Sequence, residues 1–115
     1  MKVYLAGPMR GIKDFNFPAF FAAEDKLKAD GYDVFNPARK DEQRHGVGVL
    51  TSETGNEADI VEKGFSLRMA LYDDTRFICL EADAIAMLPG WEKSAGANAE
   101  WALAKALGHK MIYLS

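Results

Sequence analysis

Short apolar runs alternate along this chain with longer segments in which apolar residues recur at helical spacing. The short runs end at turn-forming pairs such as Gly7-Pro8, which is typical of buried strands. They predict strands over 2–6, 32–35, 84–88 and 111–114. The longer segments predict helices over 18–30, 65–81 and 95–107. Gly31 and Gly108 follow two of these segments and end the predicted helices.

The order of the predicted elements is strand, helix, strand, polar stretch, helix, strand, helix, strand. This alternation predicts one α/β domain over residues 1–115, a three-layer sandwich in which helices cover both faces of a small parallel sheet of about four strands, as in flavodoxin-like and Rossmann-like folds. Such sheets bind ligands beyond the carboxyl ends of their strands. Three segments fall at that edge: 7–16, the residues from 36 onward, and 89–96.

The polar stretch over 38–64 shows little apolar pattern. A gap of this length inside a compact domain is usually a lid, a binding loop or a disordered insert, and we interpret it as a long loop or lid. A short helix over 57–63 is compatible with this interpretation. Farther along, the adjacent acids Asp73 and Asp74 allow a break that would split the 65–81 helix in two.

Composition narrows the class of protein. A net charge of -3 argues against a nucleic-acid-binding surface. No apolar run approaches the ~20 residues that a membrane helix needs, and the apolar start is too short for a signal peptide. The single cysteine, Cys79, has no internal disulfide partner, which suits the cytoplasm. His45 and His109 have no Cys or His companion at metal-ligand spacing, so we expect no metal and no other cofactor.

Glu100 is the most informative position for chemistry. It stands near the start of the predicted 95–107 helix, at the margin of an apolar stripe that includes Ala97 and Ala104. A carboxylate against an apolar face must find partners or shift its pKa. The helix also begins at the ligand-binding edge of the sheet. A surface glutamate paired with Lys105 is the alternative interpretation.

Motifs at both ends of the chain resemble those of the nucleoside 2-deoxyribosyltransferases. Segment 96–100, Gly-Ala-Asn-Ala-Glu, is similar to the family's Gly-Thr-Ala-x-Glu segment, and it too follows a strand and opens a helix. Segment 3–8, Val-Tyr-Leu-Ala-Gly-Pro, resembles the family's first strand and sugar-binding turn. Segment 88–94 resembles short members, often from phages, of uncharacterised function. The likeness implies a single nucleoside 2-deoxyribosyltransferase-like domain over 1–115, with 38–64 as its weakest part.

The resemblance implies roles for two acidic residues. In the family, the glutamate equivalent to Glu100 is the nucleophile that attacks the anomeric carbon of the sugar. The family also has an aspartate in the preceding helix that contacts the base and the sugar. Asp74 takes that place here, and Asp73 is the alternative. Two adjacent acids also fit a helix break or cap, without any role in catalysis.

The resemblance also implies a phosphate site. Ser94 matches a phosphate-contacting serine of the related 2'-deoxynucleoside 5'-phosphate N-hydrolases, although it also suits an ordinary helix cap. Arg10 resembles the arginine with which those hydrolases hold the 5'-phosphate, and a surface charge is the alternative. Pro8 departs from the hydrolases and matches the transferases instead. Gly7 allows the backbone to approach a ligand closely.

Further candidates lie around the same edge. Gly96 opens the glutamate motif and is counted with the substrate-binding residues. Tyr4 resembles the family tyrosine near the catalytic glutamate, and an ordinary core aromatic is the alternative. Trp91 follows a turn at the predicted pocket rim, where it would stack on a base or pack against a second subunit. Phe15 and Phe17 allow the same two interpretations.

These features predict an enzyme that cleaves the N-glycosidic bond of a (deoxy)nucleoside 5'-monophosphate and releases the free base. A transferase that moves deoxyribose between bases is one alternative, and a nucleotide-binding protein without turnover is another. The expected partner is a small nucleoside or nucleotide, with no nucleic acid and no membrane. Because family members are usually oligomeric, we expect a homo-oligomer with contacts near Met9, Trp91 and Trp101.

Overall fold

A parallel sheet forms the middle of the protein. The computed structural model describes residues 1–46, 48–56, 58–61, 64 and 66–115. In these residues the strands are β1 (Lys2–Ala6), β2 (Asp33–Phe35), β3 (Ala84–Met87) and β4 (Lys110–Tyr113). All neighbouring strands are parallel, and their order is β2-β1-β3-β4. The register places Tyr4 between Phe35 on one side and Ile85 on the other.

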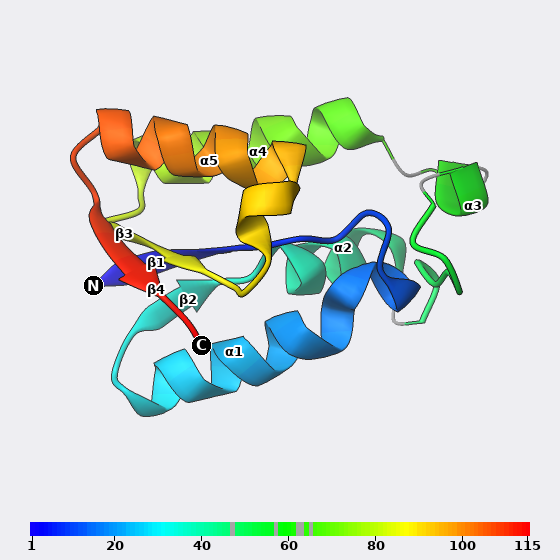
Figure 1. Cartoon of the computed structure of the whole chain (residues 1–115), viewed down its shortest axis with the longest axis horizontal. Helices are drawn as coiled ribbons and strands as arrows, with labels where there is room; N and C mark the ends of the chain where they lie inside the picture. Colours follow the sequence, from blue (N-terminus) through cyan, green and yellow to red (C-terminus); the bar gives the residue numbers. More distant parts are fainter. Residues whose placement is uncertain (47, 57, 62–63, 65) are drawn as a thin grey trace.

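Helices cover both faces of this sheet (Figure 1). On one face lie α4 (Leu67–Leu80) and α5 (Ala95–Ala106), and on the other lies α1 (Phe17–Ala29). The connections hold α2 (Pro37–His45), α3 (Ala58–Val61) and the 3-10 turns η1 (Lys13–Asn16) and η2 (Trp91–Lys93). The predicted three-layer α/β sandwich is confirmed. None of the helices in the described part of the chain has the length and apolar character that crossing a membrane requires.

The central strand β1 is apolar on both sides, and each side has a core of its own. Val3 and Leu5 pack into the core on the α1 side, whereas Tyr4 and Ala6 pack into the core under α4 and α5. Each of these four residues is at most 1% exposed. Because both faces of the strand are buried, polar residues do not alternate with apolar ones along it. Burying one large apolar side chain stabilises the fold by roughly 1.5–3 kcal/mol.

The stretch predicted as a long loop begins with a helix. Asn36 caps α2 by accepting a hydrogen bond from the Ala38 amide at 2.9 Å, and Pro37 occupies its first turn. Gly46, with φ of 104°, ends it. The prediction of a loop over 38–64 is therefore wrong for its first part. The helix is missed because it buries only two residues, and its other positions are polar. Its sequence therefore contains no apolar residues at helical spacing.

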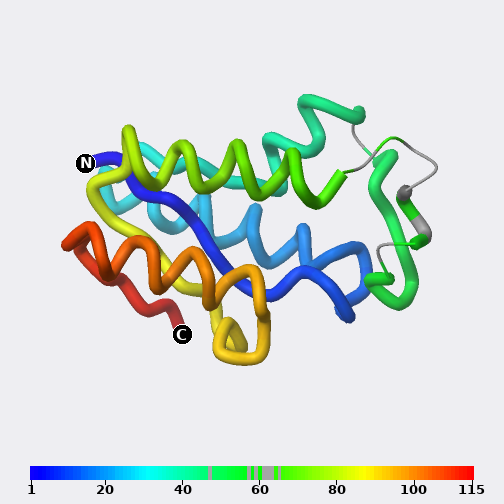
Figure 2. The backbone as a smooth tube through the Cα atoms, turned by 90° about the horizontal axis from the view of Figure 1, so that it is seen from above, coloured from blue at the N-terminus to red at the C-terminus, as the bar shows by residue number. Residues whose placement is uncertain are grey.

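The residues after α2 are bonded to the loop that follows β1. The Gly11 amide donates to the Gly55 carbonyl at 3.0 Å, and the Asp14 amide donates to the Ser52 carbonyl at 2.6 Å. A Cβ at Gly55 would lie 2.3 Å from backbone atoms of Ile12, so only glycine permits this approach. Figure 2 shows the two segments together at one end of the molecule. The segment therefore closes over the edge of the sheet where the site lies.

Two other predicted helices are observed with small changes. The α4 helix runs unbroken through Asp73 and Asp74, so the break that the sequence allows does not occur. Ser66 caps it by accepting a hydrogen bond from the Met69 amide at 3.3 Å, and residue 65, its predicted start, lies outside the described residues. The short helix predicted over 57–63 is observed at Ala58–Val61, and residues 57, 62 and 63 also lie outside.

Candidate active site

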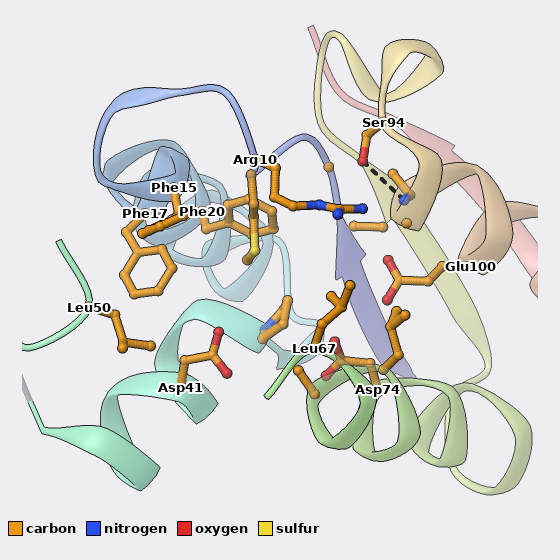
Figure 3. A pocket seen from close by; sticks show the side chains of 18 of the residues that line it. Arg10, Phe15, Phe17, Phe20, Asp41, Leu50, Leu67, Asp74, Ser94 and Glu100 are labelled. Carbon is orange, nitrogen blue, oxygen red and sulfur yellow. Dashed lines mark hydrogen bonds between the residues drawn. The ribbon is translucent and has the colours of Figure 1, made fainter. Parts of the chain in front are cut away.

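A cavity opens beyond the carboxyl end of β1 (Figure 3). Its lining comes from β1 and the loop after it, from α1 and α2, and from the facing sides of α4 and α5. Seven predicted site residues line it: Tyr4, Gly7, Arg10, Asp74, Ser94, Gly96 and Glu100. This is the edge at which parallel sheets bind ligands, so the fold brings together side chains that lie far apart in the sequence.

Glu100 belongs to the buried side of α5. It shares that side with Ala97 and Ala104, and it is only 6% exposed. The Tyr4 hydroxyl group donates a hydrogen bond to Glu100 Oε2 at 2.5 Å. This hydrogen bond fixes the carboxyl group against the strand. Tyr4 is thus both a core aromatic and a residue of the site, which combines the two interpretations that the sequence allows.

Asp74 reaches the same cavity from α4. Burial, and to a lesser extent the charge of Asp74, raises the pKa of Glu100 to about 8, although the Tyr4 hydrogen bond acts in the opposite direction. Burial, followed by the charge of Asp41, raises the pKa of Asp74 to about 7. Because ionisation of one group hinders ionisation of the other, the pair holds one proton near neutral pH. Because the pKa of Glu100 is the higher of the two, Glu100 holds this proton more often, and the form with the proton on Asp74 and an ionised Glu100 is the minor one.

The two adjacent aspartates of α4 have different surroundings. Asp73 forms an ion pair with Arg44 of α2, whereas Asp74 lines the cavity. The Asp73 pair joins α2 to α4 and needs no ligand. The cavity therefore contains the carboxyl group of Asp74 and not that of Asp73.

Positive charge gathers at the end of the cavity near α5. The Arg10 guanidinium group points toward the side where Ser94 and Glu100 lie (Figure 3). Ser94 caps α5, and its Oγ accepts a hydrogen bond from the Ala97 amide at 3.2 Å. Arg10 and Ser94 also line a neighbouring hollow, to which Lys93 contributes. Two cationic side chains beside the first turn of a helix favour an anionic group at this position.

The opposite end of the cavity is largely apolar. Phe15, Phe17, Phe20 and Leu50 line it, which places both phenylalanines that the sequence singles out in the site. Apolar walls of this kind suit a flat ring better than a sugar or a phosphate. Among them lies one carboxyl group, that of Asp41 in α2 (Figure 3).

Phe15 is held toward the cavity by an unusual turn. Asp14, Phe15 and Asn16 have φ values of 52°, 56° and 63°, in the left-handed region that is costly for phenylalanine. Side chains hold this turn: Asn16 Nδ2 donates to the Pro8 carbonyl at 3.0 Å, and the Ser52 amide donates to Asp14 Oδ1 at 3.1 Å. Strain of this type persists only where the surrounding structure maintains it, and it is typical of functional sites.

Sequence reasoning misses Asp41. The residue lies in the stretch interpreted as a loop, where one more polar side chain carries no signal. The pair Asn36-Pro37 is the signal that could have found it, because an Asn cap before a first-turn proline begins a helix. A helix from Pro37 places Asp41 one turn farther on the same side, and both residues line the cavity.

Trp91 lies away from this cavity. Its ring stacks on Trp101 with centroids 5.3 Å apart, and it lies 6.2 Å from the Tyr113 ring. The Trp101 Nε1–H group donates to the Tyr113 hydroxyl at 3.1 Å. The structure therefore does not bring Trp91 to the place where a base would bind, and packing against a second subunit is the interpretation that its position still allows.

The chain belongs to a family described as a domain of unknown function (DUF4406), which it matches over residues 1–113. Comparison with curated proteins gives no match, and comparison with solved structures gives none either. Within the described residues, no three His, Cys, Asp or Glu side chains form a group that could hold a metal ion. The family description names no activity.

Proposed function

We propose that this protein hydrolyses the N-glycosidic bond of a (deoxy)nucleoside 5'-monophosphate and releases the free base and the sugar phosphate. The observation that carries the proposal is a carboxyl pair, buried Glu100 and partly buried Asp74, in one cavity with Arg10. A cation at one end, a carboxyl pair in the middle and an apolar end match phosphate, sugar and base in that order. The resemblance of segment 96–100 to the nucleoside 2-deoxyribosyltransferases supports the same assignment.

The chemistry requires both carboxyl groups. Breaking the bond builds positive charge on the anomeric carbon and the ring oxygen of the sugar. The proposed reaction starts from the form in which Asp74 holds the shared proton and Glu100 is ionised. A Glu100 oxygen then bonds to the anomeric carbon as the C–N bond breaks, and Asp74 gives its proton to the departing base nitrogen. Asp74 then takes a proton from water, whose oxygen displaces Glu100 from the anomeric carbon. Tyr4 stabilises the carboxylate form of Glu100 before the attack and after the release.

The phosphate is assigned to the end near α5. A guanidinium group fits two phosphate oxygens at once, and Arg10 is on the side of the cavity where it can make this contact. Ser94 Oγ uses a lone pair to accept the hydrogen bond from the Ala97 amide, so the hydroxyl hydrogen of Ser94 can be donated to a phosphate oxygen. Lys93 in the neighbouring hollow adds a second positive charge.

Two other activities share the same residues. A transferase would pass the sugar from Glu100 to a second base instead of to water, and a binding protein would hold the nucleotide without cleaving it. The carboxyl pair favours an enzyme over a binder. Two carboxyl groups near a phosphate weaken the binding of an anion and cost stability, so a pure binding site gains nothing from them.

The direct test is an overnight incubation with each nucleoside and nucleoside 5'-monophosphate, ribo and deoxy, followed by chromatography for free base. We expect free base from monophosphates, and a loss of roughly a thousandfold or more in rate for Glu100→Gln. Glu53→Gln is the matched control, because Glu53 is 84% exposed. Parallel reactions contain an acceptor base. A new nucleoside would identify a transferase, and no release or exchange from any substrate would contradict both enzymatic activities.

We also propose that the protein works as a homo-oligomer in the cytoplasm. The aromatic cluster of Trp91, Trp101 and Tyr113 lies at the edge strand β4, to which Tyr113 belongs, and Tyr113 is 58% exposed. Aromatic surfaces of this kind are frequent in subunit contacts. Light scattering coupled to gel filtration gives the mass directly, and a monomer mass at micromolar protein concentration would contradict the proposal.

A further inference from the structure

Asp41 is a partly buried carboxyl group that the proposed reaction does not use. It points into the apolar end of the cavity, near Leu50, on the side away from Glu100 (Figure 3). In the described part of the chain it has charged neighbours but no hydrogen-bond partner. Removing a carboxyl group from water without giving it a hydrogen-bond partner costs free energy. A ligand that donates hydrogen bonds to Asp41 would offset this cost.

The positions of the other groups indicate which part of the substrate meets Asp41. If the phosphate lies at Arg10 and the anomeric carbon lies over Glu100, the base extends toward Asp74, its proton donor. Asp41 lies beyond Asp74 in the same direction (Figure 3), and after burial its charge is the largest cause of the raised pKa of Asp74. The outer edge of the base therefore faces Asp41.

We propose that Asp41 recognises the Watson–Crick edge of the base and selects guanine, an inference that rests on the proposed function. An ionised carboxylate has two oxygens that only accept hydrogen bonds. Guanine presents two neighbouring donors at this edge, the ring N1–H group and the exocyclic amino group. Two parallel donors on two carboxylate oxygens form the same bidentate arrangement as an arginine–carboxylate pair.

The other bases meet this carboxylate less well. Adenine and cytosine place an amino group beside a ring nitrogen that itself accepts, and uracil and thymine place one ring N–H group between two carbonyl oxygens. Each of them sets at least one acceptor against the carboxylate. Burial raises the pKa of Asp41 to about 6, so the group is mainly ionised above neutral pH. The ionised carboxylate then repels the acceptor atoms of these bases. Unpaired polar groups of this type discriminate by roughly a hundredfold or more.

The test measures kcat/KM with the guanine, adenine, cytosine and thymine deoxynucleoside 5'-monophosphates for the wild type and for Asp41→Asn. The amide has one donor and one acceptor, so it complements adenine or cytosine instead of guanine. We expect a guanine preference in the wild type. In the variant, we expect a guanine rate lower by roughly 30- to 100-fold and a higher rate with adenine or cytosine.

Two controls separate base recognition from charge and from folding. Glu42→Gln removes the same charge from the next position of α2, and Glu42 does not line the cavity, so the order of bases should stay as in the wild type. Thermal melting checks that Asp41→Asn remains folded. Calorimetric binding of the four nucleotides to Glu100→Gln, with and without Asp41→Asn, measures the same preference without turnover.

The outcomes distinguish this inference from the function on which it rests. Base release with no guanine preference, or with an unchanged order of bases in Asp41→Asn, overturns the role of Asp41 and leaves the proposed function standing. A guanine preference in binding without base release supports the role of Asp41 and contradicts the proposed reaction. Neither release nor binding for any nucleotide overturns both.

Discussion

The hydroxyl group of Tyr4 donates a hydrogen bond to Glu100 Oε2 at 2.5 Å and so joins residues that are 96 positions apart. One residue lies on the central strand β1, and the other lies on the last helix of the chain. The packing of α5 on the sheet therefore sets the position and the proton affinity of the candidate nucleophile. Changes at Tyr4 should act on chemistry rather than on substrate binding.

Tyr4→Phe should lower kcat/KM by roughly 10- to 100-fold at neutral pH. The hydrogen bond from Tyr4 lowers the pKa of both Glu100 and Asp74, so its loss raises both values. The pH–rate profile should then move to higher pH. Tyr72→Phe serves as the control, because Tyr72 is 61% exposed. An unchanged profile in Tyr4→Phe would show that this bond does not tune the carboxyl pair.

Asp74→Asn should change the shape of the pH–rate profile. In the wild type one carboxyl group must be ionised and the other protonated, which gives a bell-shaped curve with limbs near the pKa values of the pair, about 7 and about 8. An amide cannot give a proton, so the variant should be slow and its rate should lack the alkaline limb. Asp73→Asn, outside the cavity, should keep both limbs.

Glu100→Gln should stabilise the fold while it abolishes activity. The folded protein raises the pKa of Glu100 from 4.5 to about 8, so it holds this proton more tightly than the unfolded chain does. The wild type therefore loses stability as pH rises from about 4.5 to about 8, and the variant does not. The gain in unfolding free energy at pH 8 should be on the order of 2–4 kcal/mol. Urea denaturation at pH 5 and at pH 8 measures it, and an equal or lower stability at pH 8 would contradict the buried-acid interpretation.

Arg10→Ala should remove the preference for phosphorylated substrates. The rate with a 5'-monophosphate should fall by roughly 100-fold, because a charge-assisted bidentate contact is lost, while the rate with the unphosphorylated nucleoside should hardly change. Arg68→Ala, on the exposed side of α4, is the control for charge alone. Equal losses with both substrates would place Arg10 outside the phosphate site.

Arg39→Met should destabilise the fold by about 1–2 kcal/mol at neutral pH, because Arg39 is half-exposed and Lys28 still pairs with Glu24. Glu24 is 1% exposed, and it accepts hydrogen bonds from Arg39 Nε and Lys28 Nζ, both at 3.0 Å. Burial alone would raise the pKa of Glu24, but these two bonds lower it. The stabilisation is therefore present above the ordinary pKa of Glu24 and is lost as pH falls through the lowered value. Arg76→Met, which removes a surface pair with Glu81, should cost much less.

Several features of this protein follow from the order of residues alone. The apolar runs at 2–6 and 84–88 predict the central strands, and the alternation of strands and helices predicts the parallel sheet, because both signals are local in the chain. Glu100 is also visible from the sequence, because a carboxylate on an apolar helix side is unusual wherever that helix packs. The glutamate motif adds the resemblance that singles it out.

Tertiary structure decides the surroundings of each charge. Asp73 pairs with Arg44 while Asp74 faces the cavity, a difference between neighbours that only the packing of α2 against α4 creates. Asp41 enters the site because a capped helix replaces the expected loop, and Trp91 stays out because it stacks on Trp101. Apolar periodicity is a property of the residues within one element, whereas the partner of a polar group comes from another element. Contacts between distant parts of the chain therefore determine which charges are buried together.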